Sequence, residues 1–441
     1  MAYREKKGKA WVIGVDMGYG HQRTAYPLRT LAPGGKVINA NSYQGIFKKD
    51  RKTWENSRVF YEFVSRIKRI PLVGGFIFGI YNEFQKIAKF YPRRDLSEPN
   101  ISLRWIYFLV RRGWGRHLVK KLKRKPLPLI TTFFIPAFMA EVHGYEGEIF
   151  CVICDADISR TWASLNPQQS KIKYFAPNQR VVDRLKLYGV KKENIFFTGY
   201  PLPKENLGTE KLELLKNDVA HRILNLDPKS RYRYRYNSLI KEYIGSLPQK
   251  PNHPLTLMFA VGGAGAQKEI GAKILKSLAE KIKERKIKLI LVAGIRKEVK
   301  NYFLETIKNL ALKKFFNNRW IEIIFERNIQ DYFKKFNQAL RKTDILWTKP
   351  SELSFYTALG LPIIIAPPIG SQEDFNRKWL LELGSAIPQK NPNYTSEWLF
   401  DLLEAGWFAE GAMQGFIEAD KLGTFNIEKV VSHKARIWEI R

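Results

Sequence analysis

Short apolar segments that end in glycine or polar loops alternate with longer amphipathic segments, and this alternation runs through the chain twice. Such a pattern predicts strands and helices wound into a parallel sheet. At 441 residues the chain is long enough for two domains of this kind, each with its own core. We therefore expect an α/β protein with two Rossmann-like domains facing each other across a cleft. The expected strands are residues 10–15, 129–135, 149–153, 172–176 and 195–199, then 255–261, 288–293, 320–325, 345–348 and 363–366.

The positions of the two strand series set the expected domain boundaries. Residues 1–205 form the first domain, and the polar, proline-containing stretch 206–254 is a linker, since composition of this kind is typical of domain boundaries. Residues 255–395 form the second domain. Aromatic residues at helical spacing in 396–441 predict terminal helices that pack back across the domains.

The charge balance is strongly basic, with 75 Lys and Arg against 42 Asp and Glu and a net charge of +33. Such a field attracts polyanions, which include nucleic acid, anionic lipid and phosphorylated substrates. The 11 Trp and 28 Phe that accompany the charge favour a membrane interface over a purely electrostatic nucleic-acid surface, so no specific nucleic acid is expected as a partner. The two cysteines, Cys151 and Cys154, lie in an apolar run, so thiols can build neither a disulfide framework nor a four-ligand zinc site.

A long insertion, residues 37–125, is expected between the first two strands, and it is both basic and aromatic. Its apolar run 70–79 follows three cations, and a second group of cations occupies 111–125. An apolar wedge beside cations suits a surface that enters anionic lipid. We expect binding to an anionic membrane surface through residues 66–81 and 111–125. The alternative is an apolar core with solvated helix faces.

Other features of the sequence bear on the location of the protein. The basic N-terminus is followed by an apolar stretch that Asp16 and glycines interrupt, unlike a secretory signal. The uncharged runs 70–81 and 126–140 are shorter than the roughly 20 residues of a spanning helix. These features predict a cytoplasmic protein held peripherally at the inner face of the membrane.

A glycine loop follows the first expected strand, with Gly18 and Gly20 directly before His21. Backbone N–H groups in such a loop can hold an anion or a developing negative charge. An imidazole at the loop can act as a general base, so His21 is the candidate base. The alternative is a tight turn without a ligand.

A second glycine loop follows the first strand of the second series. It contains Gly262, Gly263, Gly265 and Gln267 before a helix. Two such loops in successive α/β domains predict one domain for an acceptor and one for a nucleotide diphosphate, whose charge a helix N-terminus offsets.

Several motifs occur in an order that resembles a known family. They are Asp16, Gly18, Gly20 and His21; Asp155 and Asp157; 198–201; 294–296; Lys349-Pro350-Ser351-Glu352; Leu361-Pro362; and Gln372-Glu373 before Asn376. In these motifs the chain resembles the monogalactosyldiacylglycerol synthases and the related peptidoglycan N-acetylglucosaminyl transferase, which are family 28-like glycosyltransferases of the B fold.

The resemblance implies an inverting transfer of a hexose or N-acetylhexosamine from a UDP-sugar to a diacylglycerol-like or polyprenyl-linked lipid, with no metal or other cofactor. For this reaction we expect His21 to be the base, with Asp155 as its partner or as the alternative base. The implied donor-binding residues are Gly262, Gly263, Gly265, Gln267, Arg296, Phe325, Lys349, Pro350, Ser351, Glu352, Gln372, Glu373 and Asn376. Gly18, Gly20, Arg23 and Asp157 are the expected acceptor-binding residues.

The chain also departs from the family pattern. Thr357 stands where family members usually carry a glutamate that is implied to bind the ribose, and Glu352 replaces a glycine of the turn and is a candidate substitute. For Gln372, Glu373 and Asn376 the alternative is a solvated helix start. For Asp155 and Asp157 the alternatives are a metal pair or the plain end of a strand.

Two other functions remain as alternatives. A UDP-sugar epimerase shares the fold but acts on a soluble substrate, for which the basic and apolar insertion has no use. A basic nucleic-acid-binding protein would show binding that falls steeply with salt, and no sugar turnover.

Overall fold

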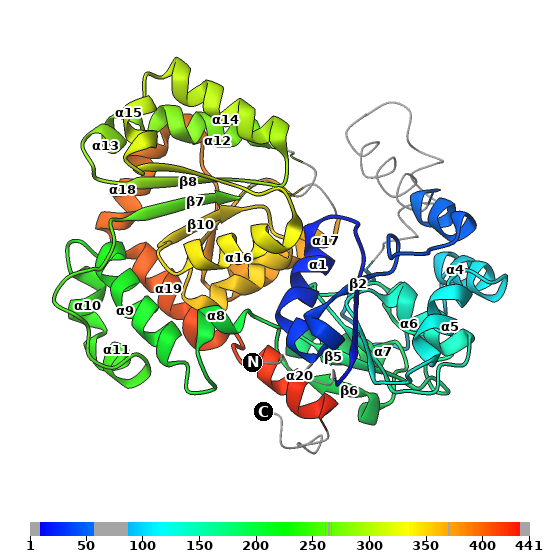
Figure 1. Cartoon of the computed structure of the whole chain (residues 1–441). Helices are drawn as coiled ribbons and strands as arrows, with labels where there is room; N and C mark the ends of the chain where they lie inside the picture. The colour runs from blue at the N-terminus through cyan, green and yellow to red at the C-terminus, as the bar shows by residue number, and fades with distance from the viewer. Residues whose placement is uncertain are drawn as a thin grey trace, which may run out of the picture. The chain divides into compact units, whose positions relative to one another are not determined.

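The computed structural model describes residues 9–56, 87–260, 262, 265, 267–368 and 371–432. The chain divides into two compact units (Figure 1). Unit 1 comprises Met1–Pro201, Ile369–Asn376 and Leu422–Arg441, and unit 2 comprises Leu202–Pro368 and Arg377–Lys421. Each unit contains a six-stranded parallel sheet, so the expected α/β class with two Rossmann-like halves is confirmed. The expected cleft between them stays a prediction.

The sheet of unit 1 has the strand order β2-β1-β3-β4-β5-β6. Its strands are β1 (Trp11–Gly14), β2 (Ile38–Asn39), β3 (Leu129–Thr131), β4 (Ile149–Val152), β5 (Ile172–Ala176) and β6 (Ile195–Phe197). Its helices include α1 (Tyr19–Ala25), the 3₁₀ helix η1 (Tyr26–Leu31), α4 (Ile101–Arg111), α5 (Arg116–Lys123), α6 (Phe134–Val142), α7 (Gln179–Leu187) and α20 (Gly423–Val431). Strand β1 pairs with β2 on one side and with β3 on the other, so the chain reverses its direction of travel across the sheet at β1.

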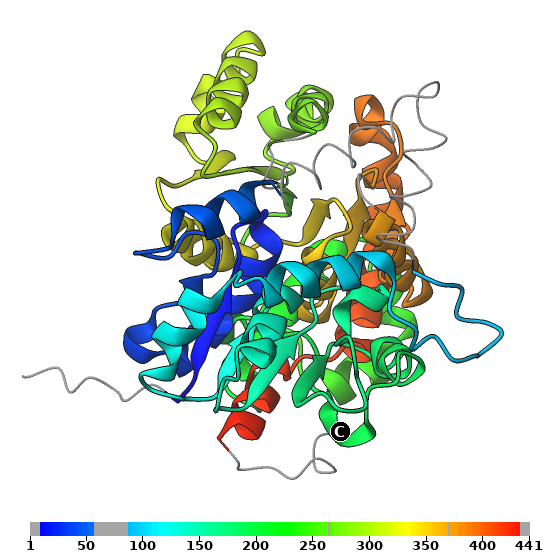
Figure 2. The ribbon, with the colours of Figure 1, turned by 90° about the vertical axis from the view of Figure 1, so that its right-hand side faces the viewer.

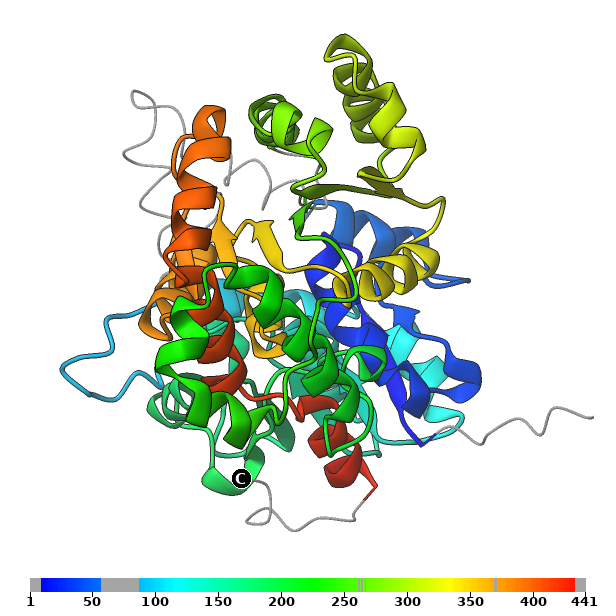
Figure 3. The ribbon, with the colours of Figure 1, turned by 90° about the vertical axis from the view of Figure 1, so that its left-hand side faces the viewer.

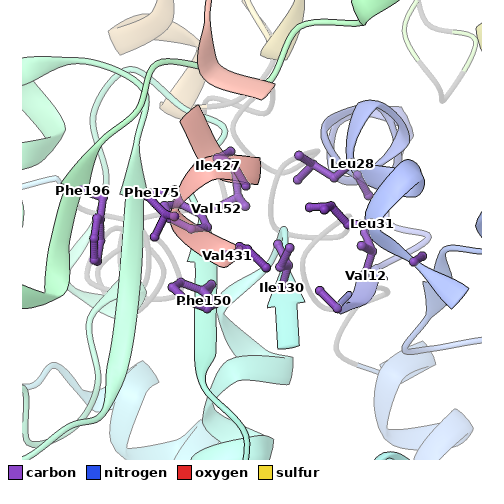
Figure 4. Close-up of a cluster of buried hydrophobic side chains, with 14 residues drawn as sticks. Val12, Leu28, Leu31, Ile130, Phe150, Val152, Phe175, Phe196, Ile427 and Val431 are labelled. Atoms are coloured by element: carbon purple, nitrogen blue, oxygen red, sulfur yellow. The ribbon is translucent and has the colours of Figure 1, made fainter. Parts of the chain in front are cut away.

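The core of unit 1 joins segments from both ends of the chain (Figure 4). Buried residues of neighbouring strands, among them Ile130 and Phe175, share this core with Leu28 of η1 and with Ile427 and Val431 of α20. The phenyl rings of Phe150 and Phe175 stack with centroids 5.0 Å apart. Burial of a side chain of this size contributes about 1.5–3 kcal/mol, so α20 is an integral part of the N-terminal unit.

The sheet of unit 2 has the strand order β12-β11-β10-β7-β8-β9. Its strands are β7 (Thr256–Ala260), β8 (Lys288–Gly294), β9 (Ile321–Phe325), β10 (Ile345–Thr348), β11 (Ile363–Ile365) and β12 (Ala386–Pro388). Its helices include α8 (Lys204–Leu207), α9 (Glu213–Leu226), α10 (Arg231–Arg235), α11 (Asn237–Tyr243), α12 (Lys268–Ser277), α13 (Ala279–Lys283), α14 (Lys297–Asn309), α15 (Lys313–Asn317), α16 (Ile329–Leu340), η5 (Glu352–Leu359), α18 (Thr395–Glu404) and α19 (Trp407–Glu418). Helix α17 (Ser371–Glu382) begins in unit 1 and continues into unit 2. Here the chain changes direction between β7 and β10.

The stretch expected to be a linker, residues 206–254, differs from that expectation. Its helix α9 packs against α19 within unit 2 (Figure 3). The buried guanidinium of Arg222 donates to the carbonyl oxygens of Thr343 at 2.7 Å and Leu359 at 2.6 Å. Because these carbonyls are buried acceptors that need donors, the polar character of this stretch serves packing and not flexibility. The helices expected in 396–441 also divide, with α18 and α19 in unit 2 and α20 in unit 1.

The strands differ from expectation in two ways: one is shorter than expected, and two edge strands were not expected. The apolar run 129–135 is a strand only as far as Thr131, and helix α6 begins at Phe134. A proline in the first turn of a helix is tolerated, and here Pro136 occupies that turn. The short edge strands β2 and β12 were not expected, and β2 lies inside the predicted insertion.

Candidate functional site

The loop after β1 in unit 1 holds its shape through a side chain from just beyond β2. Asn41 accepts from the backbone N–H of Asp16 and donates to the carbonyl oxygen of Asp16, both at 2.9 Å. Gly18 then precedes α1 with a φ of 105°, a conformation that favours glycine. The loop therefore delivers His21 into the first turns of α1, at the carboxyl edge of the sheet.

His21 is bound to the loop that follows the neighbouring strand β3. Its Nδ1 lies 2.8 Å from the carbonyl oxygen of Thr132, and the Thr132 hydroxyl donates to the carbonyl oxygen of His21, also at 2.8 Å. Because a carbonyl oxygen only accepts, Nδ1 carries the hydrogen. In the neutral ring the lone pair is then on Nε2, as a general base of this kind requires.

Aromatic and sulfur-containing side chains surround the partly buried imidazole of His21. The ring centroid of Phe133 lies 4.6 Å away and that of Trp162 lies 6.4 Å away. The sulfur of Cys154 is 3.4 Å from Nδ1, so the cysteine expected only to fill a buried strand also contacts the candidate base. Thr132 and Cys154 follow strands that neighbour one another in the sheet, which is the signal that could have identified them.

The two carboxylates after β4 have different environments. Asp155 is partly exposed and directly follows Cys154, the residue that contacts His21. Asp157 is 2% exposed. Arg184 binds both of its oxygens at 2.8 Å, and Arg180 binds one of them at 2.9 Å. The oxygens of Asp157 are thus occupied, and its place differs from the acceptor contact or metal pair considered from the sequence. Across the described ranges, no cluster of three or more His, Cys, Asp or Glu side chains could hold a metal ion.

The Asp157 ion pair leads to a prediction about stability. Replacing Asp157 with Asn leaves the buried guanidinium of Arg184 without a carboxylate, and breaking one side of a buried pair costs about 3 kcal/mol or more. We expect the free energy of unfolding of unit 1 to fall by that amount in urea titrations. Asp183→Asn is the control, since Asp183 pairs with the half-exposed Lys186 and its loss costs less than about 1 kcal/mol. Equal losses in the two variants would contradict the assignment.

The other residues expected to contact the acceptor, Gly18, Gly20 and Arg23, have different environments in the structure. Gly18 and Gly20 lie in the loop and first turn that carry His21. Arg23 is buried, at 3% exposure, on the same short helix. The two glycines adjoin the candidate base, and the acceptor-binding role of the buried Arg23 stays a prediction.

The first turns of α17 bring three more predicted residues into unit 1. Asn376 accepts from the backbone N–H of Ala156 at 2.7 Å and donates to a carboxylate oxygen of Asp155 at 3.1 Å. Gln372 and Glu373 precede Asn376 by four and three residues, and residues at these spacings share one face of a helix. Gln372 and Glu373 therefore occupy the helix face that meets the loop after β4.

The glycine loop of unit 2 makes a tight turn after β7. The N–H of Gly265 donates to the carbonyl oxygen of Gly262 at 2.8 Å, and Gly265 has a φ of 69°. A Cβ on Gly262 would lie 2.9 Å from Cε of Lys349, so the absence of a side chain lets Lys349 approach the loop. Gln267 precedes α12 and donates to the carbonyl oxygen of Pro367 at 2.8 Å. Gly263 lies outside the described residues.

Arg296 and Phe325 lie at the carboxyl ends of neighbouring strands β8 and β9. Gly294 pairs with Phe325 in the sheet, and Arg296, two residues later, is the N-cap of helix α14. The ammonium of Lys300 lies 4.8 Å from the centroid of the Phe325 ring. The structure therefore places both predicted residues on the sheet edge that also carries Gly262 and Lys349.

The turn after β10 contains Lys349, Pro350, Ser351 and Glu352. The N–H of Ser351 donates to the carbonyl oxygen of Lys349 at 2.8 Å, and Glu352 starts the helix η5 with its side chain largely buried. Thr357 is fully buried, and a Cβ on Gly415 would collide with its hydroxyl. Residue 357 thus packs against α19, where a glutamate has no room, and Glu352 is the carboxylate of this turn.

A surface that the sequence did not predict lies on α4, which faces the viewer in Figure 2. Ile101, Trp105 and Phe108 are 69%, 54% and 43% exposed and share one helix face, while Leu103, Tyr107 and Val110 are buried on another. The cations of 111–125 are adjacent, with Arg112 over the Phe108 ring. Residues 66–81 lie outside the described residues. No described helix is both long and apolar enough to cross a membrane.

Comparisons with known proteins identify a matching domain model and two relatives of this chain. The model of a domain of unknown function (DUF6938) matches residues 248–426. The chain is 23% identical over 271 residues to a processive diacylglycerol beta-glucosyltransferase of Bacillus subtilis, covering 60% of this chain and 57% of the relative. It is 21% identical over 309 residues to the enzyme of the same name from Bacillus licheniformis, covering 68% of this chain and 64% of the relative.

The chain thus spans less than two thirds of the length of either curated relative. The resemblance to glycosyltransferases that act on lipids, predicted from the motifs, is confirmed by these relatives. Among solved structures, MurG of Acinetobacter baumannii matches with a TM-score of 0.46 and 14% identity, covering 96% of this chain and 99% of that one.

Proposed function

We propose that the protein is an inverting glycosyltransferase that moves a hexose or an N-acetylhexosamine from a UDP-sugar to a lipid hydroxyl at a membrane surface. The observation that carries the proposal is the hydrogen bond between Nδ1 of His21 and the carbonyl oxygen of Thr132. It fixes the imidazole tautomer at the carboxyl ends of the paired strands β1 and β3, where the chain changes its direction of travel across the sheet. Ligands of open α/β sheets bind at such switch points.

In the proposed reaction the lipid hydroxyl oxygen attacks the anomeric carbon of the donor. Nε2 of His21 takes the hydroxyl proton, while the bond between the anomeric carbon and the diphosphate oxygen breaks. Asp155 is the carboxylate proposed to support the charge that develops on the imidazole, because its loop brings Cys154 to within 3.4 Å of Nδ1. Attack from the face opposite the leaving group inverts the anomeric centre.

The donor is proposed to bind at the carboxyl edge of the unit 2 sheet. Gly262 and Lys349 follow β7 and β10, the two strands between which the chain changes direction. Backbone N–H groups at the start of α12 and the Lys349 ammonium suit a diphosphate. They would stabilise the charge of the departing UDP, and Glu352 would bind the ribose hydroxyls.

The lipid acceptor is proposed from the relatives and from the surface of α4. Both curated relatives are named diacylglycerol glucosyltransferases, which makes glucose and diacylglycerol the first pair to test. The aromatic face of α4 beside Arg104, Arg111 and Arg112 has the composition of a helix that lies in an anionic bilayer surface.

The direct test incubates the protein with radiolabelled UDP-glucose, UDP-galactose or UDP-N-acetylglucosamine and anionic vesicles that contain diacylglycerol. We expect label to enter the lipid phase with one donor. Label that stays in water with every donor, or that appears in an epimerised free nucleotide sugar, would contradict the proposal.

The donor site leads to a separate prediction. Lys349→Met keeps the apolar stem against Gly262 and removes the ammonium. A hydrogen bond to a charged group contributes about 1.5–3 kcal/mol, so kcat/KM for the nucleotide sugar should fall by ~10- to 100-fold. Lys308→Met, which changes an exposed lysine of α14, is the control and should stay within about twofold of the wild type. An unchanged kcat/KM in Lys349→Met would remove Lys349 from the donor site.

A further inference from the structure

Asn376 is fully buried, and both ends of its side-chain amide are used within unit 1. Its oxygen accepts from the N–H of Ala156 at 2.7 Å, and its nitrogen donates to Oδ1 of Asp155 at 3.1 Å. An amide offers a donor and an acceptor in one plane. Asn376 therefore binds a backbone group and a carboxylate of the same loop at once, which is a different role from the donor contact implied by the family resemblance.

Other contacts hold the same loop around Asp155. The carbonyl oxygen of Ala156 accepts from Asn178 at 3.1 Å, so the peptide groups on both sides of Ala156 are bound by asparagines. Asp157 is bound by Arg180 and Arg184. Of the two carboxylates in this loop, only Asp155 is partly exposed, and its side chain is oriented by Asn376.

Asn376 also lies on the face of α17 that carries Gln372 and Glu373. Residues three and four positions apart are neighbours on a helix surface. A hydrogen bond from Asn376 to the loop after β4 therefore sets where these two residues stand relative to Asp155 and, through Cys154, relative to His21.

We propose that Asn376 is a positioning residue that orients the Asp155 carboxylate in the loop whose Cys154 contacts His21, and that fixes the start of α17 against the same loop. The inference rests on the proposed transfer reaction for its kinetic consequence. The contact itself is independent of that reaction. Its donor N–H is the essential group, because a carboxylate at residue 376 would place two like charges about 3 Å apart.

The decisive variant is Asn376→Asp, which is isosteric and keeps the acceptor for the N–H of Ala156. We expect kcat to fall at least ~10-fold near neutral pH and the acidic limb of the pH–rate profile to move to higher pH. KM for the nucleotide donor should change by less than about threefold, because the contacts proposed for its diphosphate and ribose, at Gly262, Lys349 and Glu352, are unchanged. Asn194→Asp adds the same charge to unit 1 at a position whose amide donates to the carbonyl oxygen of Ser170 at 3.1 Å, and should leave the pH profile unshifted.

A second measurement needs no activity. As pH rises from about 4 to 7, residues 155 and 376 of Asn376→Asp both ionise, so the Tm deficit of this variant against wild type should widen. It should stay constant in Asn194→Asp. A Tm deficit of Asn376→Asp that is independent of pH would overturn the contact with Asp155. In the kinetic experiment, an unshifted pH–rate profile with a raised donor KM would show that Asn376 binds the donor instead. If the wild type transfers no sugar, the proposed function fails, while the Tm comparison still decides the contact.

Discussion

Replacing His21 with Ala is expected to lower kcat for sugar transfer by ~10²- to 10⁴-fold, the usual contribution of a general base. The acceptor hydroxyl then has no side chain to take its proton, while the donor site in unit 2 is unchanged. KM for the nucleotide sugar should therefore stay within about threefold of the wild type. Transfer of label into lipid, followed at saturating donor, measures the loss.

Two further variants separate the base from its surroundings. His21→Asn keeps an N–H that can reach the carbonyl oxygen of Thr132 but has no basic nitrogen, so it should be as inactive as His21→Ala. Exogenous imidazole should restore part of the activity of His21→Ala. His143→Ala removes a histidine that bonds the carbonyl oxygen of Trp114 and should retain activity. Wild-type rates in His21→Asn would show that the imidazole only positions the loop.

Most strands could be predicted because buried parallel strands are continuous apolar runs. The runs at 172–176 and 345–348 coincide with β5 and β10. The run at 129–135 could not be divided correctly, because helix α6 is buried nearly all round and such a helix has no polar face to mark its start. The two-residue strand β2 carries too few residues for any periodicity to show.

The candidate base could be predicted from the glycine loop, but its environment could not. Thr132 is 111 residues from His21 in the sequence, and their contact depends on β1 and β3 being neighbours in the sheet. The different roles of Asp155 and Asp157 were equally hidden, because Arg180 and Arg184 come from α7. Whether a carboxylate forms a structural ion pair or stays partly exposed depends on the side chains that pack against it. For Asp157 these side chains come from another element, which is distant in sequence.

The exposed apolar surface of α4 could not be predicted, because the helix has two apolar faces. Ile101, Trp105 and Phe108 have the helical spacing that usually marks a buried face, and so do Leu103, Tyr107 and Val110. Two apolar faces on one helix cannot be ranked from the sequence, because either one could face the core. The structure assigns the first set to the surface and the second to the core.

The double variant Trp105→Ser/Phe108→Ser is expected to weaken binding to anionic vesicles by ~30- to 140-fold. Inserting two half-exposed aromatic side chains into the bilayer surface contributes about 2–3 kcal/mol together, and about 1.4 kcal/mol corresponds to a factor of ten. Tyr234→Ser is the matched control, because Tyr234 is an exposed aromatic residue of unit 2, at 91% exposure. Flotation with vesicles of graded anionic lipid content measures the partition coefficient. Equal vesicle binding by the double variant and the control would show that α4 does not enter the membrane. Loss of vesicle binding in the double variant alone, with turnover of a water-soluble short-chain acceptor retained, would separate membrane docking from the chemistry at His21.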